Sequence, residues 1–125
     1  MNTSPKILFV DDEEDIREVV KLRLESSGYA VDTAGSGEEA IRKVASNRPD
    51  MMILDVMMPG MDGLAVLKKI RKDEIDTHLP IIILTAKRKK MIGDLFELEN
   101  IQGFIEKPFE SAMLLDIIKK TLSRT

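Results

Sequence analysis

The chain has 125 residues, of which 33% are charged and 43% hydrophobic, with no cysteine, no tryptophan and one histidine. This length fits one domain whose apolar core is large enough to fold without disulfides or a structural metal. The lack of cysteine excludes disulfide scaffolds, thiol catalysis and cysteine-ligated zinc, and one histidine excludes sites that need two imidazoles. A net charge of −3 excludes a bulk basic surface for nucleic acid.

The apolar runs are also too short for a membrane. They reach about five residues, far below the roughly 18 of a spanning helix, and no signal peptide is apparent at the start of the chain. We therefore expect a cytoplasmic protein without membrane insertion, folded as one domain over residues 1–125. Its core is expected at about 6–122, with mobile ends at 1–5 and 123–125.

Five short segments predict β-strands. Four are continuous apolar runs, which are typical of strands covered by helices on both faces. The other alternates apolar and polar residues, so we expect it at the edge of the sheet with one wetter face. In chain order the predicted strands are 7–10, 29–33, 51–54, 81–84 and 103–105.

Between these strands the apolar residues recur at helical spacing. Gly28 is expected to end the first helix, and Ser36 with Glu39 forms a capping-box pattern at the start of the second. The alternation predicts an α/β fold, a single-domain doubly wound five-stranded parallel sheet with right-handed crossovers and five helices. The apolar positions of the predicted helices are Ile16, Val19, Val20 and Leu24; Ala40, Ile41, Val44 and Ala45; Leu64, Val66, Leu67 and Ile70; Met91, Leu95, Phe96 and Leu98; and Met113, Leu114, Ile117, Ile118 and Leu122.

Polar residues follow the predicted strands at the edge where such sheets bind ligands. Asp11 and Asp12 follow the first strand, Asp55 the third, Thr85 the fourth and Lys107 the fifth. Three carboxylates at one edge repel each other unless cations compensate. Lys107 supplies one positive charge, and Mg²⁺ would supply two more because it accepts a site with few carboxylates. Asp55 would then act as a carboxylate nucleophile toward a phosphoryl group, which Thr85 and Lys107 would bind.

These residues also carry a family resemblance. Over residues 6 to about 122 the chain resembles the CheY-like receiver domain of two-component response regulators. The resemblance implies a flavodoxin-like sheet of strand order 2-1-3-4-5. It also implies that a sensor histidine kinase or phosphotransfer protein phosphorylates Asp55, with no enzymatic role beyond self-phosphorylation and slow autodephosphorylation. The motifs that match in order and spacing are Asp11-Asp12, Asp-Val-Met-Met-Pro-Gly-Met-Asp-Gly at 55–63, Thr85-Ala86 and Lys107-Pro108-Phe109.

The resemblance further implies a set of Mg²⁺ ligands. Asp12, Asp55 and the backbone carbonyl of Met57 would bind the ion directly, and Asp11 would contribute through water. Met57 and Lys87 flank the path of the hydrolysing water in this family. A thioether does not orient that water and an ammonium does not accept its proton, so we expect slow autodephosphorylation.

Other positions would carry the signal. Thr85 and Lys107 would bind the phosphoryl oxygens, and the Lys107–Pro108 peptide bond would be cis. Phe104 stands where the family keeps a switching aromatic, although an aromatic there is explained equally well as core. Phosphorylation would then alter the face formed by the fourth helix, the fifth strand and the fifth helix. The expected partner of that face is a downstream protein or a second copy of the chain, and not nucleic acid.

Alternatives from other classes are less consistent with these residues. A constitutive interaction module on the same fold would not use phosphate, yet the five pocket positions named above are intact. A phosphatase of the haloacid-dehalogenase type would show Asp-x-Asp after the first strand and a cap domain. A flavin carrier would need a phosphate-cradling loop where Asp11 and Asp12 stand. The basic run at 87–90 is explained either as a solvated helix start or as a contact for an acidic partner.

Overall fold

The computed structural model describes residues 4–56, 63–72, 78–85 and 101–123. The strands in these ranges are β1 (Lys6–Val10), β2 (Ala30–Ala34), β3 (Met51–Asp55), β4 (Ile81–Thr85) and β5 (Gly103–Glu106). The helices are α1 (Glu14–Ser26), α2 (Gly37–Ser46), α3 (Gly63–Lys72) and α5 (Ser111–Leu122). The helix predicted around 91–98 lies outside the described residues, as do most of the chain ends predicted to be mobile.

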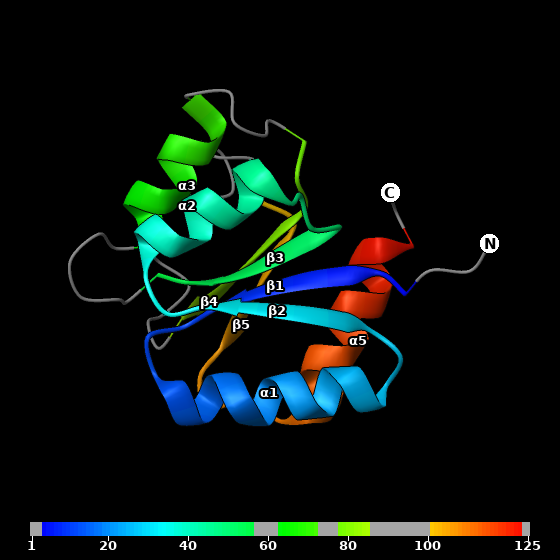
Figure 1. Ribbon diagram of the computed structural model, residues 1–125. Coiled ribbons are helices and arrows are strands. Elements are labelled where there is room, and N and C mark those ends of the chain that lie inside the picture. The colour runs from blue at the N-terminus through cyan, green and yellow to red at the C-terminus, as the bar shows by residue number, and fades with distance from the viewer. Residues whose placement is uncertain (1–3, 57–62, 73–77, 86–100, 124–125) are drawn as a thin grey trace.

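The strands form one parallel sheet in the order β2-β1-β3-β4-β5. Helices α1 and α5 cover one face, and α2 and α3 cover the other (Figure 1). The predicted α/β fold and strand order are therefore confirmed, including the edge position of β2. None of the helices over the described residues has the length and apolar character of a transmembrane span.

Both faces of the sheet are apolar, which explains the continuous hydrophobic runs. Successive side chains of a strand point to opposite faces. In β1, Ile7 and Phe9 pack in the layer with α1 and α5, whereas Leu8 and Val10 pack in the layer with α2 and α3. Strands β3 and β4 are buried along their whole length because helices cover them on both sides.

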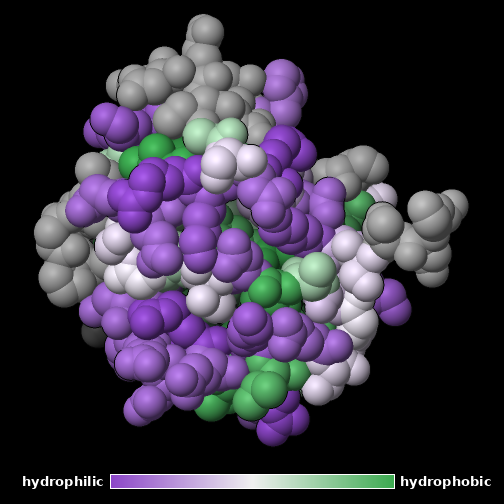
Figure 2. Space-filling model, viewed as in Figure 1, coloured by the Kyte–Doolittle hydropathy of each residue, from purple (hydrophilic) through white to green (hydrophobic). Residues whose placement is uncertain are grey.

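Some apolar helix positions do not face the core. The helical spacing predicted Val19 and Met113 on the apolar stripes of α1 and α5, but these side chains are 57% and 54% exposed. Ala45 of α2 is also exposed. The apolar stripe of each helix is wider than the face that meets the sheet, so residues at its margin remain in solvent. Figure 2 shows hydrophobic surface over α1 among mostly hydrophilic residues, and Leu22 of the same helix is 67% exposed.

The predicted helix ends are present with one difference. Ser36 is the N-cap of α2, and its side chain accepts a hydrogen bond from the backbone N–H of Glu39 at 3.2 Å. The Glu39 carboxylate does not return to Ser36 but accepts from the N–H of Gly35, at 2.8 Å. Gly28 follows the end of α1 with φ +97°, a left-handed conformation that favours glycine, and donates its N–H to the Glu25 carbonyl.

Candidate functional site

The parallel register brings the carboxyl ends of the strands to one edge of the sheet. Val10 pairs with Leu54 across β1 and β3, so the residues that follow each of them are neighbours. Asp55 pairs with Leu84 of β4, and Thr85 pairs with Glu106 of β5. The structure therefore gathers the predicted strand-end residues at the same edge.

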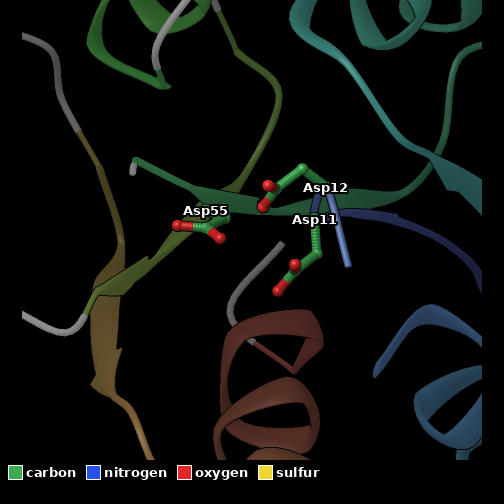
Figure 3. Close-up of side chains that lie close together, drawn as sticks. All are labelled: Asp11, Asp12 and Asp55. Atoms are coloured by element: carbon green, nitrogen blue, oxygen red, sulfur yellow. The ribbon is translucent and has the colours of Figure 1, made fainter. Parts of the chain in front are cut away.

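Three carboxylates converge at this edge. The ligand atoms of Asp11, Asp12 and Asp55 all lie within 4.8 Å of one another. Figure 3 shows the three side chains reaching toward a shared space from the ends of β1 and β3. Asp11 and Asp55 are buried, with 0% and 2% of their surface exposed, whereas Asp12 is exposed. The cluster is thus buried on the side of the sheet and open to solvent at Asp12.

Lys107 lies between two of these carboxylates. Its Nζ is 2.9 Å from Asp11 Oδ2 and 3.1 Å from Asp55 Oδ2, and it lies 4.0 Å from the exposed Glu13 carboxylate. Burial opposes the charged form of the ammonium, but its contacts with Asp11 and Asp55 outweigh burial and raise the pKa of Lys107. Lys107 therefore stays protonated and cancels one of the negative charges.

The backbone at Lys107 is hydrogen-bonded to the neighbouring strand end. The Lys107–Pro108 peptide bond is cis, as the resemblance implies. The N–H of Lys107 donates to the carbonyl of Thr85 at 2.7 Å, which ties the end of β5 to the end of β4. Thr85 itself is buried, with 1% of its surface exposed. Its hydroxyl is thus carried by a strand end that is linked directly to Lys107.

Asp11 is held by its backbone and its side chain. Its N–H donates to the Ala34 carbonyl at 3.1 Å, and its own carbonyl accepts from Arg17 Nη1 at 2.7 Å. Asp11 Oδ1 accepts from the N–H of Glu13 at 2.9 Å. Asp11 Oδ2 is buried, and its contact among the described residues is the ion pair with the Lys107 ammonium at 2.9 Å. A buried carboxylate oxygen has more than one lone pair, so Asp11 Oδ2 can accept a further contact from a metal ion or an ordered water beside the ammonium.

The donor set fits a hard divalent cation. Within the described part of the chain, three carboxylates and one ammonium meet here, so the carboxylates outnumber the cation that contacts them. Carboxylate oxygens with solvent access at Asp12 suit Mg²⁺, which keeps several waters in its coordination sphere. The predicted backbone ligand Met57 and the residue Lys87 lie outside the described residues.

Two residues near the site were not singled out by the sequence reasoning. Gly63 begins α3, and a Cβ at this position would lie 2.3 Å from Val56 Cα and 2.5 Å from the Asp55 carbonyl oxygen. Any side chain there would displace the backbone that carries Asp55. Gly63 was part of the quoted motif, which is a usable signal, whereas the contact of Arg17 with Asp11 has no signature in the sequence.

Phe104 lies next to this edge on β5. It pairs with Ile83 of β4, two residues before Thr85, and its half-buried side chain packs against the core layer of α2 and α3. On the other side it lines a cavity of about 510 Å³ together with Met113 and Ile117 of α5. Phe104 thus belongs to the core and to the β5–α5 surface at once.

Comparison with known proteins agrees with this geometry. The family model described as "Response regulator receiver domain" matches residues 7–119. The alkaline phosphatase synthesis transcriptional regulatory protein PhoP of Bacillus subtilis is 39% identical over 120 residues, which cover 96% of this chain and 49% of that protein. The response regulator MprA of Mycobacterium ulcerans is 40% identical over 123 residues, which cover 98% of this chain and 52% of that protein. The chain therefore spans about half the length of these relatives.

Solved structures show the same architecture. The chemotaxis protein CheY4 of Vibrio cholerae superposes with a TM-score of 0.88 at 33% identity, covering 95% of this chain and 99% of that one. A CheY-like receiver domain protein of Methanospirillum hungatei superposes with a TM-score of 0.90 at 26% identity, covering 98% and 96%. Because the family model spans most of its length, the chain belongs to the receiver domain family of response regulators, which act in two-component phosphorelays.

Proposed function

We propose that Asp55 is the phosphoacceptor of this receiver and that Asp11, Asp12 and Asp55 hold Mg²⁺. The observation that carries the proposal is the buried Asp55 carboxylate within 4.8 Å of two further carboxylates and 3.1 Å from an ammonium. A carboxylate in this position can attack phosphorus, while the surrounding cationic charge offsets the repulsion between the anionic pocket and an incoming phosphoryl group. Met57 is proposed to add its backbone carbonyl to the ligand set.

The reaction transfers a phosphoryl group from a phosphohistidine donor to Asp55, the acceptor. An Asp55 oxygen forms a bond to phosphorus as the bond from phosphorus to the donor imidazole nitrogen breaks, and the imidazole leaves with the electron pair and takes up a proton. When bound, Mg²⁺ neutralises charge on the phosphoryl oxygens. Lys107 already contacts Asp55 Oδ2, so its ammonium needs little movement to pair with a phosphoryl oxygen. The Thr85 hydroxyl donates to another of these oxygens.

The signal is proposed to pass along β4 to β5. A hydrogen bond from Thr85 to the phosphoryl group displaces the end of β4, which is tied to β5 through the Lys107 N–H and the Ile83–Phe104 register. Phe104 then changes its packing, and the surface of β5 and α5 changes with it. This surface is proposed to bind a downstream protein or a second copy of the chain.

Removal of the phosphoryl group is proposed to be slow. The side chains expected beside the hydrolysing water, Met57 and Lys87, neither orient that water nor accept its proton. The Met57→Asn variant supplies a polar group at that position and should hydrolyse its phosphoryl group faster than the wild type. A loss of the phosphorylated mass at the wild-type rate would count against this explanation.

Intact mass spectrometry tests the phosphoacceptor directly. The protein is incubated with acetyl phosphate with and without Mg²⁺, and a gain of roughly 80 Da that requires Mg²⁺ is expected. Asp55→Asn should abolish the gain, whereas Asp116→Asn, a matched change at an exposed carboxylate of α5, should leave it unchanged. An adduct of equal yield on Asp55→Asn would refute the assignment of Asp55. If the wild type gains no adduct with acetyl phosphate and none with a phosphohistidine donor, phosphoryl transfer to this chain is refuted.

A further inference from the structure

Arg17 connects the acidic site to the neighbouring loop. It lies on α1, and its Nη1 donates to the carbonyl of Asp11 at 2.7 Å. That carbonyl belongs to the peptide unit that joins Asp11 to Asp12. Because a peptide unit is planar and rigid, a contact that holds this carbonyl restricts the backbone of both carboxylate-bearing residues.

The other side of the guanidinium rests on the loop between β2 and α2. A Cβ built at Gly35 would lie 3.0 Å from Arg17 Nη1 and 3.2 Å from Cζ, so the guanidinium packs directly against this glycine. Gly35 is held in turn by the Glu39 carboxylate, which accepts its N–H at 2.8 Å. This hydrogen bond, with the charges of Lys43 and Arg17, lowers the pKa of Glu39. Arg17 is thus fitted between a fixed loop and the Asp11 carbonyl.

Such a support is needed because the carboxylates of the site repel one another. Three carboxylates are held within 4.8 Å of one another, with one ammonium between two of them. Asp12 is exposed, so packing alone does not keep it directed into the cluster. A side chain that fixes the Asp11–Asp12 peptide prevents the two residues from turning apart.

We propose that Arg17 is a positioning residue for the Mg²⁺ site, which it preorganises by clamping the Asp11–Asp12 peptide against Gly35. The proposal rests on the Mg²⁺ site of the proposed function. For the removal of Arg17, this proposal predicts a change in Mg²⁺ affinity opposite in sign to the change that charge alone predicts. Arg17 is a cation beside a cation site, so its removal by electrostatics alone would tighten Mg²⁺ binding. Loss of positioning weakens binding instead, by about tenfold, as for other groups that orient metal ligands.

The test is a Mg²⁺ titration of the unphosphorylated protein, followed by amide chemical shifts in NMR spectra, which also report that each variant is folded. Arg17→Ala should bind Mg²⁺ about tenfold more weakly than the wild type. Arg17→Lys, which retains a donor and the charge but not the planar group, should recover part of the affinity. Arg23→Ala removes an exposed arginine of the same helix and should bind as the wild type does.

If Arg17→Ala does not fold, Gly35→Ala perturbs the same clamp more gently, because its Cβ presses on the end of a flexible side chain. It should weaken binding in the same direction, by less than the tenfold expected for Arg17→Ala. Wild-type or tighter Mg²⁺ binding by Arg17→Ala, or by Gly35→Ala where the first variant is unfolded, would overturn the positioning role and leave the metal site standing. A wild-type protein that binds no Mg²⁺ would refute the site and the role of Arg17 together.

Discussion

Replacing Lys107 with methionine should destabilise the metal-free protein. Methionine retains much of the apolar stem but removes the ammonium 2.9 Å from Asp11 and 3.1 Å from Asp55. At an effective dielectric constant of about 20, each contact corresponds to an attraction of about 5–6 kcal/mol, most of which desolvation offsets. Loss of one partner of a buried ion pair costs about 3–5 kcal/mol net. Because the Lys107 side chain is 19% exposed, we expect the lower end, about 3 kcal/mol.

Magnesium should reduce this deficit. Without the ammonium, the three carboxylates lose the positive charge that contacts them, so the variant binds Mg²⁺ more tightly than the wild type. A ligand stabilises the folded state by RT ln(1 + [L]/Kd), or about 1.4 kcal/mol at ten times Kd, and the variant gains more at any given concentration. The difference in stability between the two proteins should therefore shrink as Mg²⁺ is added.

The dependence on pH follows from the raised pKa of Lys107. The raised pKa of Lys107 means that its ion pairs stabilise the folded state fully at pH values below its pKa in the unfolded chain, about 10.5. This stabilisation is lost as the pH rises through the higher pKa of the folded protein. The deficit of the variant should thus stay constant between about pH 6 and pH 9.

Urea unfolding followed by circular dichroism, with and without Mg²⁺, measures these differences. Lys120→Met is the matched control, because Lys120 forms an exposed ion pair with Asp116 at 3.0 Å and should change stability by less than about 0.5 kcal/mol. The reasoning would be refuted by a Lys107→Met protein as stable as the wild type without Mg²⁺. A deficit that grows with Mg²⁺ would refute it equally.

Three further predictions follow from local contacts. Gly63→Ala places a Cβ 2.3 Å from the backbone of Val56, the residue after β3. Urea unfolding should therefore show a loss of stability of at least about 2 kcal/mol, and mass spectrometry should show a lower yield of phosphorylation. Wild-type values in both assays would show that α3 shifts freely to accept the side chain. Ser36→Ala removes the N-cap contact of α2 and should cost about 1 kcal/mol in thermal unfolding, and an unchanged melting temperature would mean that the cap is redundant. Burial opposes the charged form of Asp32, but hydrogen bonds from Lys43 and from the backbone N–H of Thr33 outweigh it and lower the pKa of Asp32. The backbone N–H of Gly35 and the charge of Lys43 lower the pKa of Glu39. Both carboxylates therefore stabilise the fold at neutral pH, and this contribution is lost as the pH falls through the lowered pKa values. Lys43→Met should therefore lose less stability than the wild type between about pH 5 and pH 3, and equal losses in urea midpoints would contradict the role of this ion pair.

The sequence by itself was sufficient to predict the fold and which residues at the strand ends lie close together. A strand covered on both faces is apolar at every position, as in the run at 81–84. A helix covered on one face is apolar only at helical spacing. These local patterns were therefore sufficient to predict the parallel sheet and its helices. The end of each strand then identified Asp11, Asp55, Thr85 and Lys107 as neighbours, because parallel strands end at one edge.

The tertiary structure decided the contacts of these residues. Periodicity defines an apolar stripe relative to the helix axis but not how much of it meets the sheet, so Val19 and Met113 are exposed although both lie on such stripes. The ion pairs of Lys107 with Asp11 and Asp55 join strands that are separated by up to 96 positions in sequence, and their distances depend on the packing of the whole sheet. The partner of Arg17 is a backbone carbonyl, a group that every residue possesses, and only the folded chain selects which one the guanidinium reaches.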